Sequence, residues 1–74
     1  MKKPLISLKI FGKDSEKVDS LVSRKRRRIY AFLKADNFKD CTFNVRVRYE
    51  YGLPNEGTYA TKKELIHALK AFLE

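Results

Sequence analysis

The stretch CTFNVRVRYEY, residues 41–51, has the most regular hydrophobic pattern in the chain. Hydrophobic side chains occupy the odd positions from Cys41 to Tyr51, and polar or charged side chains occupy the even positions from Thr42 to Glu50. Successive side chains of a β-strand point to opposite faces, and β-branched and aromatic residues favour strands. The pattern therefore predicts a strand over residues 41–51, with one buried face and one polar face.

Two shorter segments also predict strands. Residues 5–11 alternate in the same way, with apolar side chains at the even positions 6, 8 and 10. The sequence GLPNEG that follows the long strand has the composition of a loop. A short strand at about residues 58–60 is then expected to pair back on the 41–51 strand as a hairpin.

A helix is predicted at the end of the chain. Thr61 and Glu64 have the spacing of a capping box, in which each side chain accepts a hydrogen bond from the backbone N–H of the other. Leu65 to Leu73 then follow with apolar residues at helical spacing. We expect one amphipathic helix over this segment.

A longer helix is predicted between the first two strands, from about Ser15 to Ala35. Asp14 or Ser15 would accept hydrogen bonds from its first N–H groups, and the pair Asp36-Asn37 predicts a turn after it. At 1.5 Å per residue this helix would be about 30 Å long. Its apolar stripe, at about 100° per residue, comprises Val18, Leu21, Val22, Ile29, Phe32 and Leu33.

One lysine conflicts with this helix. Lys25 falls inside the apolar stripe, and a buried, unpaired ammonium group would be costly. Three resolutions are open. The aliphatic stem of Lys25 packs while the ammonium group reaches an edge, or a bulge or break near Ser23 turns the side chain outward, or an acidic partner or a second protomer meets it.

The expected element order is β-α-β-β-α within one domain over residues 1–74. A strand-helix-strand crossover in one sheet is right-handed and lays its helix on one sheet face. The sequence therefore predicts an α+β fold, a two-layer sandwich of a three-stranded mixed sheet with both helices on one face. The second face of this sheet would be open to solvent or to a partner.

Charge is the outlying property of the composition. Seventeen Lys and Arg residues against nine Asp and Glu residues give a formal net charge of +8, which is typical of domains that bind polyanions. The single cysteine, Cys41, excludes an internal disulfide, so a cytoplasmic location is expected. No apolar run approaches the roughly 18 residues that a membrane span needs, so no membrane association is expected.

Three groups of cations are candidate phosphate contacts. The five consecutive basic residues 24–28 sweep more than a full helical turn, so they cannot form one surface and only some of them look outward. The start of the last helix favours anions, and the polar face of the sheet carries further cations. The candidates are Arg24, Arg27 and Arg28 from the run, Lys62 and Lys63 from the last helix, and Lys9, Arg46 and Arg48 from the sheet face.

The sequence GTYATKKELIHALKAFL, residues 57–73, is loosely similar to the end of double-stranded-RNA-binding domains, where a strand leads into a helix that opens with Ser-Lys-Lys. Thr61, Lys62 and Lys63 occupy that motif here. The resemblance covers less than a quarter of the chain, and the rest departs from the family because a strand precedes the first helix. The resemblance implies that Lys62 and Lys63 contact phosphate.

Catalysis and metal binding are disfavoured. A catalytic nucleophile needs an oriented base, and Cys41 and His67 are expected on a buried strand face and a polar helix face. These two residues cannot supply the four ligands of a structural zinc site. The loop at residues 52–57 spaces two glycines, but Thr58 stands where a phosphate-binding loop needs Lys. We therefore expect no enzyme activity, cofactor, metal or small-molecule substrate.

The leading hypothesis is a small basic domain that binds RNA or DNA through mostly sequence-independent phosphate contacts. The alternative is a protein-protein interaction module with no nucleic-acid role. Such a module would be either a homodimer, formed through the open sheet face or an edge strand, or an accessory protein that docks on an acidic partner.

Overall fold

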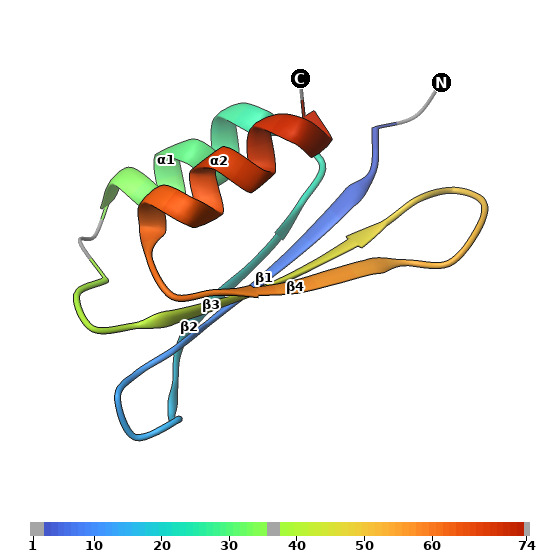
Figure 1. Cartoon of the computed structure of the whole chain (residues 1–74). Coiled ribbons are helices and arrows are strands. Elements are labelled where there is room, and N and C mark those ends of the chain that lie inside the picture. The colour runs from blue at the N-terminus through green and yellow to red at the C-terminus, as the bar shows by residue number, and fades with distance from the viewer. Residues whose placement is uncertain (1–2, 36–37, 74) are drawn as a thin grey trace.

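A computed structural model describes residues 3–35 and 38–73 of the chain, and places a sheet in one layer and two helices side by side in the other (Figure 1). The turn predicted at residues 36 and 37 lies outside the described residues. In chain order the elements are β1 (Leu5–Phe11), β2 (Lys17–Ser23), α1 (Arg26–Ala35), β3 (Thr42–Arg48), β4 (Asn55–Tyr59) and α2 (Lys62–Leu73).

The sheet has four strands in the order β2-β1-β3-β4, and every neighbouring pair is antiparallel. The predicted β-α-β-β-α order with a three-stranded mixed sheet is therefore wrong, although the α+β composition was predicted correctly. The observed order is β-β-α-β-β-α, which is a β-hairpin followed by a helix, repeated once. The first strand of each repeat is central, and the second strand lies at an edge.

The additional strand, β2, comes from the first half of the predicted long helix. Gly12 N–H donates to the Glu16 carbonyl at 2.8 Å, and Ser15 N–H donates to the Gly12 carbonyl at 3.0 Å. Ser15 has φ +66°, a left-handed conformation that suits a tight turn. Asp14 and Ser15, which the helix prediction used as caps, therefore belong to a hairpin turn.

The break between strand and helix resolves the conflict at Lys25. β2 ends at Ser23, whose Oγ accepts a hydrogen bond from the Lys25 N–H at 3.0 Å. The Lys25 carbonyl accepts from the Ile29 N–H at 3.1 Å, so Lys25 occupies the N-cap position of α1. The side chain of Lys25 is exposed, and a break near Ser23 is the correct one of the three resolutions.

The hydrophobic core lies between the sheet and the helices. Alternate residues of the two central strands meet one face of each helix, as the alternating and helical patterns predict for these segments. The buried residues are Ile6, Leu8 and Ile10 of β1, Phe43, Val45 and Val47 of β3, Ile29 and Leu33 of α1, Leu65 and Leu69 of α2, and Phe38.

The long central strand ends earlier than its pattern predicts. The pairing of β3 with β4 ends at Val47 opposite Asn55, and the connection turns through Gly52, which has φ +96°. Beyond this point alternation no longer corresponds to the two faces of a sheet. Tyr49 and Tyr51, which the pattern places on the buried face, are 42% and 85% exposed.

A lysine joins the two helices. The Nζ of Lys62 donates a hydrogen bond of 2.6 Å to the backbone carbonyl of Leu33, and it lies 5.6 Å from the centroid of the Phe38 ring. Leu33 is near the C-terminus of α1, where the helix dipole favours a cation. Lys62 therefore ties the start of α2 to the end of α1.

Replacement of this lysine is expected to destabilise the fold. Lys62→Ala removes a charge-assisted hydrogen bond and leaves the Leu33 carbonyl without it, so the free energy of unfolding falls by about 1.5 kcal/mol. Lys63→Ala, at the exposed neighbouring position, is the matched control and changes it by less than about 0.5 kcal/mol. Urea denaturation followed by circular dichroism measures both values. Equal reductions in the two variants would contradict the helix-joining role.

Candidate functional site

Six cationic side chains gather at one end of the sheet. A hollow of about 640 Å³ is lined by Lys3 and by the four consecutive residues 24–27. An adjoining hollow of about 260 Å³ shares Lys3 and Arg24, and adds Arg48 together with the carboxylate of Glu50. We call these cations the basic end; they are Lys3, Arg24, Lys25, Arg26, Arg27 and Arg48.

The strand register creates the basic end. β1 pairs antiparallel with both of its neighbours, so the start of β1 lies beside the ends of β2 and β3. Leu5 is opposite Arg48, and Ile6 is opposite Ser23. The residues that precede β1, follow β2 and end β3 are therefore brought together, although they are far apart in the sequence.

The start of α1 adds to the positive potential. Peptide dipoles give a helix N-terminus a partial positive charge, and its first N–H groups have no partner within the helix. The first turn of α1, which is fully described, contains no acidic residue. Lys25 at the N-cap lacks the side-chain oxygen that Ser, Thr, Asp or Asn would offer there. An anion at this position would complement both the amides and the cations.

The structure divides the predicted phosphate contacts among several places. Arg24 and Arg27 line the basic end as predicted neighbours, and Arg48, which was predicted on a separate surface, joins them. Arg28 is exposed on α1 but does not line either hollow. Lys62 and Lys63 begin α2, beside the C-terminus of α1 and thus at the opposite end of that helix.

Two further predicted contacts lie on the open face of the sheet, which the helices do not cover (Figure 1). Lys9 is exposed and pairs with Asn44, in the middle of the sheet. Arg46 forms an ion pair of 3.3 Å with Glu56 on β4. This carboxylate partly neutralises the face, so the open face is less positive than its cations alone suggest.

Sequence reasoning missed three members of the basic end. Lys25 was assigned to the interior of an apolar stripe and Arg26 was not among the predicted contacts, because the predicted helix begins near Ser15 whereas α1 begins at Arg26. Lys3 precedes the first strand, and only the register of β1 brings it to Arg24. The signal available in the sequence was the conflict at Lys25, which pointed to a break near Ser23.

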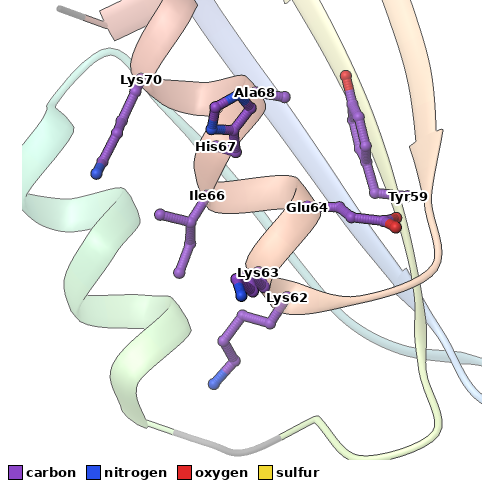
Figure 2. A pocket seen from close by; sticks show the side chains of 8 residues that line it. All are labelled: Tyr59, Lys62, Lys63, Glu64, Ile66, His67, Ala68 and Lys70. Carbon is purple, nitrogen blue, oxygen red and sulfur yellow. The ribbon is translucent and has the colours of Figure 1, made fainter.

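A further hollow, of about 880 Å³, lies around α2 and does not form a convergent site. Figure 2 shows that its side chains lie on different sides of α2: Ile66 and Lys70 extend toward α1, whereas Glu64 and the β4 residue Tyr59 lie on the other side. The ammonium group of Lys62 is already bonded to Leu33. The polar groups of this hollow do not converge on one point (Figure 2).

The thiol and imidazole groups lie in different places in the described part of the chain. Cys41 Sγ is 3.5 Å from the Lys39 carbonyl, and it is not among the residues that surround His67 in the hollow at α2. Within residues 3–35 and 38–73, no group of three or more His, Cys, Asp or Glu side chains is placed to hold a metal ion. Neither of the described helices is long and apolar enough to span a bilayer.

Comparison of the chain with protein-family models, with curated proteins and with solved structures gives no match. The partial likeness of residues 57–73 to double-stranded-RNA-binding domains thus gains no support from a family model. Functional assignment rests on the chemistry of the basic end.

The N-cap lysine is expected to cost stability. Lys25→Asn would supply a capping oxygen for the N–H groups of the first turn and remove one of the crowded like charges, so the free energy of unfolding rises by about 1 kcal/mol at low salt. Lys39→Asn, in an exposed turn, is the control and gives no comparable gain. Thermal and urea unfolding measure the change. A reduced stability of Lys25→Asn would show that residue 25 does not occupy the N-cap position of α1.

Proposed function

We propose that this protein binds nucleic acid through phosphate contacts at the basic end, with little dependence on base sequence. The observation that carries the proposal is the hollow lined by Lys3 and residues 24–27, with Arg48 in the adjoining hollow. Among the described residues that line the two hollows, one acid, Glu50, stands against six cations, whereas on the open face of the sheet the carboxylate of Glu56 pairs with Arg46. Clustered cations beside a helix N-terminus are suited to phosphate.

Phosphate is favoured over other anions by the number and type of the cations. Four of the six are arginines, whose planar guanidinium groups match phosphate oxygens in a bidentate manner. These cations come from three separate segments of the chain and line two adjoining hollows, and a nucleic-acid backbone presents regularly repeated charges that can meet both hollows. The net charge of +8 acts in the same direction, because it accelerates the encounter with polyanions.

Binding is tested by fluorescence anisotropy with labelled duplex and single-stranded oligonucleotides at several salt concentrations. We expect dissociation constants of about 1–100 μM near physiological salt, weakening steeply as salt rises. The triple variant Arg24→Gln, Lys25→Gln, Arg27→Gln should weaken binding to all sequences by a similar factor. It should also reduce the slope of log affinity against log salt by roughly 0.9 for each duplex phosphate that the variant no longer neutralises.

A charge-matched variant separates the basic end from net charge alone. Lys13→Gln, Lys39→Gln and Lys70→Gln together remove the same three charges from exposed positions outside the basic end. This variant should retain most of the affinity and most of the salt slope. An equal weakening of binding in the two triple variants, or no salt-dependent binding by the unaltered protein, would refute the proposal.

A second candidate function, self-association through β2, is favoured by two exposed valines. Val18 and Val22 lie on this edge strand and are 49% and 60% exposed. An edge strand offers unpaired backbone groups to another strand. Antiparallel pairing of two β2 strands about Ser20 would place Val18 of each copy opposite Val22 of the other. It would also place the carboxylate of Glu16 opposite Arg24.

The molecular mass of the protein in solution tests whether it dimerises. If β2 mediates a dimer, sedimentation equilibrium should give twice the monomer mass of 8.7 kDa. Val22→Lys should then restore the monomer, because it replaces the apolar contact with Val18 of the other copy by a charged side chain on the edge strand. Val18→Thr, which keeps a β-branched side chain, should leave the dimer largely intact. A monomeric mass for the unaltered protein at high concentration would exclude dimerisation.

A further inference from the structure

The connection between β3 and β4 carries three exposed hydrophobic side chains. Tyr49, Tyr51 and Leu53 are 42%, 85% and 88% exposed, and they lie within five residues of one another. Figure 1 shows this connection projecting from the sheet at the end where β1 begins. Large apolar groups that remain exposed together often mark a binding surface.

One of these tyrosines belongs to the same hollow as the cations. Tyr49 lines the smaller hollow together with Lys3, Arg24 and Arg48. An aromatic ring, phosphate-binding side chains and a concave surface are therefore combined at one place. Tyr51 follows two residues later and is almost fully exposed, so it offers a second ring beyond the edge of the hollow.

We propose that the basic end and the β3–β4 connection together bind single-stranded nucleic acid, with unpaired bases stacked on Tyr49 and Tyr51. This inference rests on the proposed function and assigns its preferred substrate class. Unpaired bases expose both faces to aromatic side chains, whereas the bases of a duplex are stacked on each other. The cations hold the backbone, and the tyrosines hold the bases.

The acidic residue between the tyrosines orients the strand. Glu50 lines the same hollow as Arg24 and Arg48, and its carboxylate repels phosphate. The backbone therefore lies at the larger hollow, which is lined by Lys3 and residues 24–27, and the bases lie at the smaller hollow beside Tyr49. A carboxylate there can also accept a hydrogen bond from an exocyclic amine of a base, such as that of cytosine.

A membrane surface is the other partner that combines anionic groups with apolar ones. Stable binding to an interface requires a substantial buried apolar area. Of the exposed hydrophobic residues in the connection, only Leu53 is aliphatic, and the two tyrosines carry polar hydroxyl groups. The observed surface therefore matches bases with flat aromatic faces better than acyl chains.

The test compares three ligands of about ten nucleotides at one salt concentration: a single strand, a duplex, and a single strand without bases. The unaltered protein should bind the single strand with a lower dissociation constant than either of the other two ligands, when the concentration of each ligand is expressed as phosphate. Tyr49→Ala and Tyr51→Ala should each weaken single-strand binding by about fivefold or more and should change binding to the duplex and the abasic strand less than about twofold. Tyr49→Phe and Tyr51→Phe should retain the affinity, because they keep the rings.

Leu53→Ser is the matched control in the same connection, and it should leave single-strand binding unchanged. Tyrosine variants that bind the single strand like the unaltered protein, or a preference for the duplex, would overturn the inference. It would also be overturned if Leu53→Ser and the tyrosine variants mainly abolished binding to phosphatidylserine vesicles. In each of these outcomes, the triple variant Arg24→Gln, Lys25→Gln, Arg27→Gln tests the proposed function separately. If that variant does not bind the duplex or the abasic strand, the proposed function stands and only the base-stacking inference fails.

Discussion

The antiparallel pairing of β1 with β3 is the interaction on which the other features depend. It places Ile6 opposite Val47 and Leu8 opposite Val45, and these side chains form the layer on which both helices pack. The same register places Leu5 opposite Arg48 at the end of the sheet. The hydrophobic core and the basic end therefore both depend on the register between β1 and β3. A shift of this register by one residue would exchange the buried and exposed faces of the strand and separate the cations.

Sequence patterns predicted the elements that bury one face in the core and expose the other. They did not predict the strand that is largely exposed. β1, β3 and α2 carry regular patterns because one face of each is in the core. β2 is an edge strand and is largely exposed, so its fold does not require alternating apolar and polar side chains. Its apolar residues Val18, Leu21 and Val22 therefore fit a helical stripe by their spacing alone. The intrinsic preference of such a segment was overridden by the hairpin turn at residues 12–16 and by pairing with β1.

The candidate site could be predicted only in part, for a related reason. Arg24 and Arg27 were identified from the basic run itself, but the union of that run with Arg48 and Lys3 depends on strand register, which composition does not reveal. Tyr49 was predicted to be buried because its alternation with β3 continues past the end of the strand. What distinguishes it physically is its position one residue after Arg48, where β3 ends and regular alternation between two sheet faces ends with it.

The two ends of α1 differ in how their partial charges are balanced. At the C-terminus, Lys62 supplies a cation to the Leu33 carbonyl at 2.6 Å, which complements the negative end of the dipole. At the N-terminus, a lysine occupies the cap and further cations surround it, so like charges meet the positive end of the dipole. A sequence optimised only for stability would place Ser, Asp or Asn at this cap. The unfavourable arrangement is concentrated at one end of α1, and a bound phosphate backbone would bring negative charge to that end.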